Sequence, residues 1–154
     1  MEAQQTAVKA IAWTPFTSTN AQMRLNLPAV PTETEGKMNG KYPMWTLTAK
    51  HPQVQVVAVS ITYPTILNRK QAQTVVDSTL EQLSKSNSLT IKSMGEVNEG
   101  TYGRRGVLQS NDTLMKARVF VLGDTLYQLI LSSSPENIGA ISENEFFGSF
   151  SRVR

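Results

Sequence analysis

The most site-like group of residues in this sequence is a tyrosine followed closely by two arginines, Tyr102, Arg104 and Arg105. Guanidinium groups bind carboxylates and phosphates through paired hydrogen bonds, so this group could contact an anion or an acidic partner. Adjacent strand residues point to opposite faces of a sheet, however, so Arg104 and Arg105 can clamp one anion together only where a bulge realigns them. The alternative is that both arginines are merely solvated.

Three glycines surround this group at a spacing of three, at Gly100, Gly103 and Gly106. A phosphate-binding loop needs its glycines at the start of a helix. This segment runs instead into an apolar pair, Val107 and Leu108, which is typical of a strand. We therefore interpret the glycines as signs of bulges in a kinked edge strand, whose unpaired backbone groups could accept a partner strand.

Sets of catalytic residues cannot be assembled from this sequence. It has no cysteine and a single histidine, His51, which excludes thiol chemistry and zinc sites built on cysteine or on several histidines. We expect His51 to be exposed and inert, because it stands beside a proline in a hairpin turn. The twelve acidic residues fall in expected loops, on helix surfaces or near strand ends. We therefore predict no enzyme activity, no cofactor and no transition metal, although Glu33 and Glu35 are a conceivable metal pair.

The composition is that of a globular protein with a polar surface. Of 154 residues, 40% are hydrophobic and 18% are charged, and the formal net charge is +3. Serine, threonine, asparagine and glutamine make up almost a third, as in many secreted and periplasmic β-rich domains. The basic residues are scattered, which argues against nucleic-acid binding. No apolar run reaches the roughly 18 residues of a transmembrane helix.

The polar start, Met-Glu-Ala-Gln-Gln, suggests a mature N-terminus with an initiator methionine added. On this interpretation the natural precursor is exported or lipid-anchored and the protein works outside the cytoplasm, in a periplasm, in a lumen or on a membrane. A plain cytosolic start is the alternative. We expect residues 1–12 to form a flexible tail and residues 13–154 to form one domain, monomeric or weakly dimeric.

The first half of the domain is expected to contain strands and one long loop. Trp13 and Phe16 flank a proline and should anchor the tail to the domain. Residues 28–41 contain two prolines, two glycines and no apolar period, so we expect a surface loop that could carry binding. The strands expected here are residues 22–27, 42–50 and 54–63.

One convincing helix is expected, over residues 69–85, because its apolar residues recur at amphipathic spacing. Asn68 and Gln71 match a capping box at its start. A short C-terminal helix should begin with a second capping box, Ser142 and Glu145. The strands expected in this half are residues 89–94, 101–109, 114–122 and 125–131.

A tight Gly-Asp turn at residues 123–124 fixes the register of the last two strands. It places Phe120 opposite Tyr127 on a face that also carries Lys116 and Arg118. The other face is almost entirely apolar and must be covered. The aromatic residues expected in the core are Phe120, Tyr127, Phe146 and Phe150, and we expect replacement of Phe150 by alanine to cost about 3–5 kcal/mol.

Strands and helices are segregated along the chain, which predicts an α+β fold with an antiparallel sheet. Three segments of the C-terminal half form a further pattern: the glycine-flanked residues 99–107, the hairpin at 115–129, and Phe-Phe-Gly-Ser-Phe at 146–150. This pattern resembles that of uncharacterised bacterial domains, and the element order is similar to the PsbP-like fold. The resemblance implies an antiparallel sheet sandwiched between helices and a role in binding or assembly, and it transfers no metal or photosystem contact.

Together these observations predict a non-catalytic binding or assembly module whose partner is another protein. The residues expected to bind it are Tyr102, Arg104 and Arg105. Two alternatives stay open. One is a small-ligand-binding protein or enzyme with a pocket near residues 28–41, and the other is a cytosolic chaperone or secretion accessory factor.

Overall fold

The chain forms two antiparallel sheets and one long helix. The structure is a computed structural model and describes residues 10–98 and 100–153. The main sheet consists of β3 (Thr32–Met38), β4 (Tyr42–His51), β5 (Val54–Thr62), β6 (Thr90–Glu96), β7 (Tyr102–Gln109), β8 (Leu114–Leu122) and β9 (Thr125–Ser133). The smaller sheet consists of β1 (Thr14–Ser18), β2 (Met23–Leu27) and β10 (Ser151–Arg152). The helices are α1 (Arg69–Asn87), α2 (Glu143–Phe147) and the 3₁₀ turn η1 (Ile138–Ala140).

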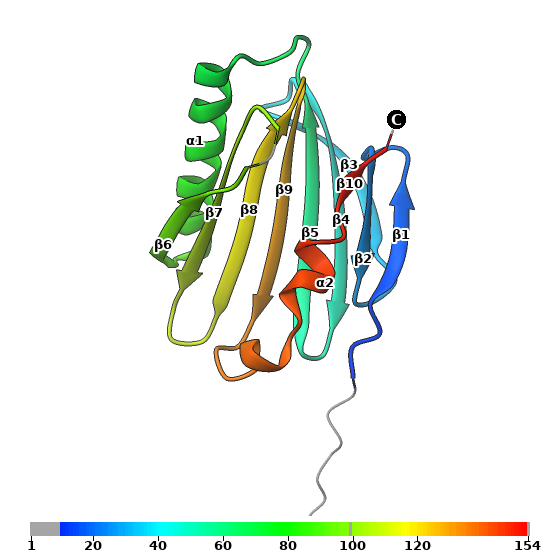
Figure 1. The fold of residues 1–154 in the computed structure, drawn as a ribbon, viewed down its shortest axis with the longest axis vertical. Coiled ribbons are helices and arrows are strands. Elements are labelled where there is room, and N and C mark those ends of the chain that lie inside the picture. The colour runs from blue at the N-terminus through cyan, green and yellow to red at the C-terminus, as the bar shows by residue number, and fades with distance from the viewer. Residues whose placement is uncertain (1–9, 99, 154) are drawn as a thin grey trace, which may run out of the picture.

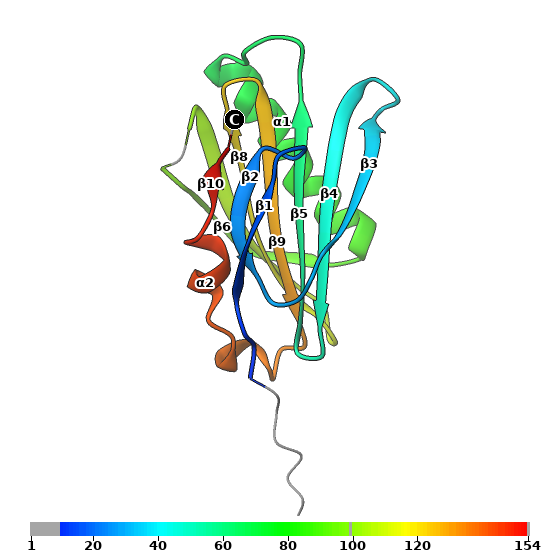
Figure 2. The same cartoon turned by 90° about the vertical axis from the view of Figure 1, so that its right-hand side faces the viewer.

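The main sheet has the strand order β3-β4-β5-β9-β8-β7-β6, and all its neighbouring strands are antiparallel. Helix α1 lies on one face, and the β1-β2-β10 sheet lies with α2 on the other (Figures 1 and 2). The predicted α+β class is therefore confirmed. The prediction that helices cover both faces of the sheet is met only in part. A long helix covers one face, but a three-stranded sheet and a helix of five residues cover the other.

Side chains alternate across the main sheet and so build one apolar layer on each face. The layer between α1 and the main sheet includes the buried residues Val76 and Leu80 of α1 and Val119, Val121 and Leu126 of the sheet. Buried residues of the layer beneath the smaller sheet and α2 include Met23, Leu25, Phe120, Tyr127 and Phe146. Trp13 and Phe16 pack against this second layer, as predicted for the anchor of the tail. Most of the predicted tail lies outside the described residues.

The start of α1 follows from its sequence. The side chain of Asn68 accepts a hydrogen bond from the backbone N–H of Gln71, and the Gln71 side chain accepts one from the backbone N–H of Asn68. The predicted capping box is therefore confirmed. The helix ends at Asn87, and the C-cap residue Ser88 adopts a left-handed conformation with φ of 54°. Ala72, Val76 and Leu80 are buried, as the apolar stripe requires.

The hairpin of β8 and β9 has the register predicted from its turn. Phe120 pairs with Tyr127 and Arg118 pairs with Leu129, and the two aromatic ring centroids are 5.7 Å apart. Gly123 has φ of 64°, a conformation that glycine adopts without strain.

Residues 28–41 are not the long loop that we expected. They contain β3, which pairs with β4 at one edge of the main sheet. Because an edge strand has only one neighbour and much of β3 is exposed, its sequence Thr-Glu-Thr-Glu-Gly-Lys-Met needs no apolar alternation. Strands β1 and β10 also escaped prediction, because they are short and largely exposed.

The glycine-flanked strand β7 was expected at an edge of the sheet, and this was wrong. It pairs with both β6 and β8, and β6 forms the edge. The bulge lies in β6, between Ile91 and Ser93. Close packing explains Gly103 better, because a Cβ atom there would lie 2.8 Å from the Cβ atom of Phe120.

The C-terminus closes the core in part as predicted. Phe146 is fully buried, whereas Phe150 is partly buried and packs against the same core cluster. The Phe150 ring makes edge-to-face contacts with Phe120 and Tyr127, at centroid distances of 5.0 and 4.9 Å. The aromatic core is therefore confirmed except for the depth of Phe150.

The capping box predicted for α2 is wrong. Ser142 makes no side-chain capping hydrogen bond. Glu145 instead reaches Asn26 of β2, whose amide nitrogen lies 3.5 Å from its carboxylate. The Glu145 side chain, which a capping box would have used, thus contacts the smaller sheet instead.

A basic hollow between strands β6 to β8 and helix α2

The predicted binding group of Tyr102, Arg104 and Arg105 is divided between the two faces of the sheet. Tyr102 and Arg104 lie on the face covered by α1, where Arg104 forms a 3.1 Å ion pair with Asp77. Tyr102 is buried, and the guanidinium carbon of Arg69 lies 5.3 Å from its ring centroid. Burial and, next, the charge of Asp77 raise the pKa of Tyr102. These two residues are thus engaged within the protein.

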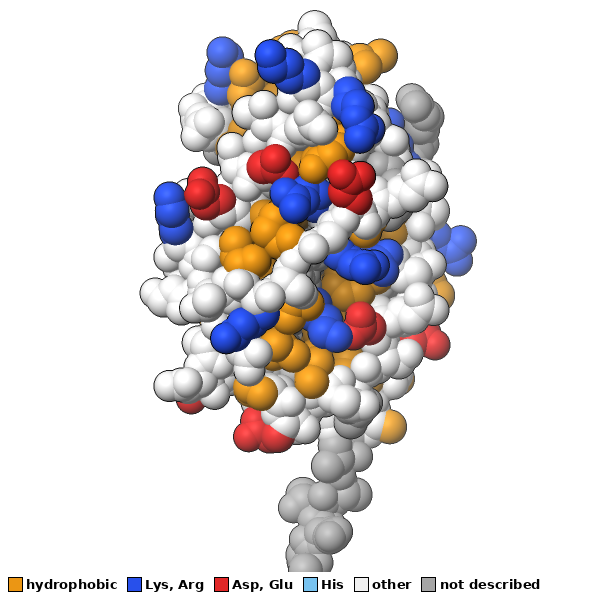
Figure 3. Space-filling model, turned by 60° about the vertical axis from the view of Figure 1, so that its left-hand side comes forward, with side chains coloured by type: hydrophobic (Ala, Val, Ile, Leu, Met, Phe, Trp, Pro, Cys, Tyr) orange, Lys and Arg blue, Asp and Glu red, His pale blue; other side chains and the backbone are white. Residues whose placement is uncertain are grey.

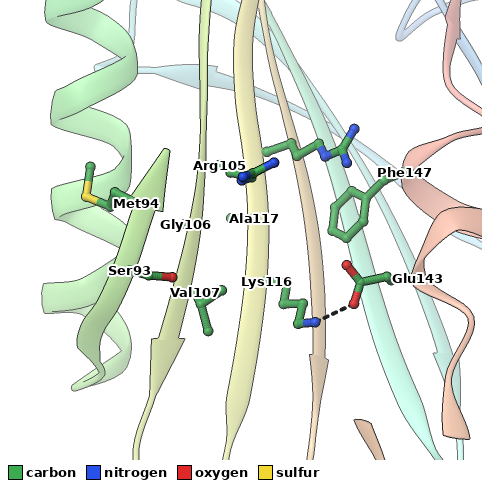
Figure 4. A pocket seen from close by; sticks show the side chains of 10 residues that line it. Ser93, Met94, Arg105, Gly106, Val107, Lys116, Ala117, Glu143 and Phe147 are labelled. Atoms are coloured by element: carbon green, nitrogen blue, oxygen red, sulfur yellow. Dashed lines mark hydrogen bonds and ion pairs between the residues drawn. The ribbon is translucent and has the colours of Figure 1, made fainter. Parts of the chain in front are cut away.

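Arg105 lies on the opposite face, where other cations surround it. Its partner across the β7–β8 pair is Arg118, and Lys116 follows on the same face of β8. The three side chains line a hollow of about 310 Å³ (Figure 4). In the space-filling view, basic side chains gather around hydrophobic ones on this part of the surface (Figure 3). The residues lining the hollow are Ser93, Met94, Arg105, Gly106, Val107, Lys116, Ala117, Arg118, Glu143 and Phe147.

Helix α2 supplies one wall of this basic hollow. The Lys116 ammonium group forms an ion pair with the Glu143 carboxylate, and Figure 4 shows this contact from β8 to α2. The guanidinium carbon of Arg118 lies 5.1 Å from the ring centroid of Phe147, which is within the range of a cation–π interaction. The helix therefore positions two of the three cations.

The charges of the hollow do not cancel. Among the described residues, Glu143 is the only acid that lines it, and it is already paired with Lys116. Within the part of the chain that the structure describes, no carboxylate forms an ion pair with Arg105 or Arg118. Like charges directly opposite each other on antiparallel strands destabilise a sheet. An anion between the two guanidinium groups would remove this repulsion and accept hydrogen bonds from both.

A small residue leaves room for Arg105 at the edge of the sheet. Gly95 of β6 pairs with Arg105, and a Cβ atom on this glycine would lie 3.3 Å from the Arg105 Nε atom. The arginine side chain therefore lies over Gly95 of the edge strand β6. Sequence reasoning placed Lys116 and Arg118 on one face but missed their meeting with Arg105, because the order of the strands was unknown.

A second hollow, of about 390 Å³, lies near the end of the 28–41 segment, where the alternative pocket was expected. The residues lining it are Lys41, Tyr42, Pro43, Thr62, Tyr63 and Pro64. Its two tyrosine rings are 4.7 Å apart, and burial raises the pKa of Tyr63, with Tyr42 adding to the effect. No acid or imidazole stands among these residues, so they offer no general base near neutral pH.

Possible metal ligands stay apart among the described residues, where no three His, Asp or Glu side chains gather as a metal site requires. Glu33 accepts a 2.8 Å hydrogen bond from the side chain of Asn20. His51 is partly buried rather than exposed, and its Nδ1 atom accepts a 3.1 Å hydrogen bond from the backbone of Gln53. Neither helix in the described ranges is long and apolar enough to cross a membrane.

Comparison with known proteins identifies the fold. No protein-family model and no curated protein sequence matches the chain. The solution structure of cyanobacterial PsbP (CyanoP) from Synechocystis sp. PCC 6803 is similar over 97% of this chain and 98% of that chain, with a TM-score of 0.62 and 9% identity. A crystal structure from Bacteroides thetaiotaomicron VPI-5482 aligns with 91% of this chain at 12% identity, but this chain spans about half (48%) of it and the TM-score is only 0.42. The chain has a PsbP-like fold, as its C-terminal motifs indicate.

Proposed function

We propose that this domain is a non-catalytic module that binds an acidic segment of a protein partner in the basic hollow. One observation carries the proposal: Arg105 and Arg118 are directly opposite each other, and neither has an ion-pair partner among the described residues. Two guanidinium groups on one face of the sheet bring many hydrogen-bond donors to the same hollow. Of the three residues predicted from the sequence, only Arg105 belongs to the proposed site. Arg118 and Lys116 take the place of Tyr102 and Arg104, and the proposed partner is still acidic.

The lining of the hollow favours a protein segment over a free inorganic anion. Val107 and Phe147 present apolar surface beside the cations. A partner with an acidic residue next to an apolar one would satisfy both parts of the hollow. Charge complementarity of this kind mainly increases the rate of encounter and the specificity.

Catalysis has little support at this place. Among the described residues that line the hollow, Glu143 is the one that could act as a general base near neutral pH, and its carboxylate is paired with Lys116.

A location outside the cytoplasm is part of the same proposal. It is supported by the neutral polar composition.

The proposal is tested by measuring the affinity for a glutamate-rich peptide at 0.15 M salt. The double variant Arg105→Gln/Arg118→Gln should bind at least about tenfold more weakly than the wild type. The matched control is Lys70→Gln/Lys85→Gln, which removes the same charge from the exposed side of α1. The control should bind within about twofold of the wild type, because screening at this salt acts over about 8 Å. Equal losses in both variants would reduce the effect to net charge and contradict the proposal.

A further inference from the structure

The strand next to the basic hollow has an open edge. β6 pairs with β7 on one side, and no other strand of residues 10–98 and 100–153 pairs with its outer side. Most of its side chains are exposed, including Thr90, Ser93 and Met94. Such an edge carries unpaired backbone N–H and C=O groups that can pair with an extended segment of another chain.

The side chains of β6 leave the path from this edge to the cations open. Two of the β6 residues on the face of the hollow are Ser93, which pairs with Val107, and Gly95, which pairs with Arg105. Both are small, and the Arg105 guanidinium group already lies over Gly95. A longer side chain at either position would separate the edge from the hollow.

The strand spacing of a sheet connects these two observations. A strand added along β6 would lie about 4.8 Å from it, and its side chains would alternate between the two faces. A residue opposite Gly95 would therefore place its side chain on the face of the hollow, beside the Arg105 guanidinium group. On the other face the neighbouring residue Glu96 would repel an acid, so the charge pattern favours acidic residues on one face only.

We infer that the acidic segment of the partner binds as an added β-strand along β6, with an aspartate or glutamate opposite Gly95. This inference rests on the proposed function and specifies how the partner is held. Backbone hydrogen bonds to β6 supply affinity, and the position opposite Gly95 supplies specificity.

The test uses a short capped peptide of alternating threonine and valine with one central glutamate. Hydrogen exchange of the full chain, followed residue by residue, should slow at alternate backbone amides of β6 when the peptide is added, and α1 should not change. A peptide with N-methyl groups on the amides that face β6 should bind at least about tenfold more weakly, although its charge is the same. Replacing the central glutamate by glutamine should weaken binding about tenfold as well.

A pair of variants examines the path over Gly95. Gly95→Val places a branched side chain where the Arg105 guanidinium group lies, and it should weaken peptide binding at least about fivefold. The control Thr90→Val puts the same side chain on the same strand outside the hollow and should leave binding unchanged. Both variants introduce valine, a strong strand former, so both should fold.

Three results would overturn the inference. Binding that depends on Arg105 but leaves the exchange of β6 unchanged would keep the proposed function and reject strand addition. Absence of any peptide binding would reject both. Slowed exchange of the β6 amides without peptide, increasing with protein concentration, would assign this edge to a second copy of the chain.

Discussion

Arg105 and Arg118 are paired residues of neighbouring antiparallel strands and carry like charges on the same face of the sheet. This pair lowers the stability of the sheet, because opposite charges or apolar residues at the same two positions would be more favourable. Proteins accept such local costs at functional sites. The pair therefore connects the architecture of the sheet with the proposed binding role.

The charge repulsion has a measurable consequence for stability. Arg105→Gln should increase the free energy of unfolding by about 0.2–1 kcal/mol, because it removes one of two like charges opposite each other. Urea denaturation at low salt should show the gain, and added salt should diminish it.

The neighbouring arginine provides the control for this experiment. Arg104 forms an ion pair with Asp77 on the other face, and both side chains are partly exposed. Arg104→Gln should therefore lower the free energy of unfolding, by at most about 1 kcal/mol. If Arg105→Gln destabilises the protein as much as Arg104→Gln, the like-charge interpretation is wrong.

The charge of Glu143 should oppose the binding of an acidic partner. In the part of the chain that the structure describes, no other acid lines the hollow, and this carboxylate competes with the partner for Lys116. Glu143→Gln should therefore bind the glutamate-rich peptide about threefold to tenfold more tightly. Glu145→Gln on the same helix removes a charge that does not line the hollow and should change affinity less than twofold. Weaker binding by Glu143→Gln would show that the ion pair supports the site.

Gly103 should tolerate no side chain. A Cβ atom there would lie 2.7 Å from a Val97 methyl group and 2.8 Å from the Cβ atom of Phe120, so Gly103→Ala should cost about 1–3 kcal/mol by overpacking. Gly36→Ala is the matched control in β3, where the nearest atom is a Met44 methyl group at 3.5 Å. Thermal unfolding of both variants compares them directly. Equal stability of the two would argue against close packing of β7 on β8.

The aromatic residues of the C-terminus should differ in their contribution to stability. Phe146 is fully buried, so Phe146→Ala should cost about 3–5 kcal/mol. Phe150→Ala should cost less than the value expected from the sequence, because this ring is half-buried. Chemical denaturation that finds Phe150→Ala the more damaging variant would contradict the described packing.

Alkaline pH should reveal the burial of Tyr102. Burial and Asp77 raise the pKa of this phenol above 10.0, so the folded state holds the proton more tightly than the unfolded state. The free energy of unfolding should then be unaffected by this group below pH 10 and should fall as the pH rises further. Denaturation curves measured between pH 9 and 11 should show a smaller decrease of the free energy of unfolding in Tyr102→Phe than in the wild type. Part of the decrease should persist in this variant, because the pKa of Tyr63 is raised as well. An unchanged slope would place the Tyr102 hydroxyl in water.

The sequence determined the local elements better than their arrangement. The capping box of Asn68 and Gln71 and the turn at Gly123 are local signals, and both are confirmed. Strand β3 has one neighbour and little apolar alternation, so its pairing with β4 could not be inferred from its own residues. Ser142 shows the reverse case, in which a matching local motif gave way to a tertiary contact.

The basic character of the candidate site could be predicted from the sequence, but the set of residues that form it could not. The two-residue strand period correctly separated Arg104 from Arg105. Arg118 and Lys116 joined Arg105 only through the pairing of β7 with β8, and Glu143 and Phe147 joined through the docking of α2. These contacts depend on strand order and on tertiary packing, which the spacing of residues along the chain does not contain.

The most direct test of the central claim is to map the binding of the glutamate-rich peptide by NMR on the full chain. The account predicts that the largest chemical-shift changes occur at Arg105, Lys116, Arg118 and Phe147, and that they disappear in the Arg105→Gln/Arg118→Gln variant. Largest changes on the exposed face of α1, or equal changes in that variant, would contradict it.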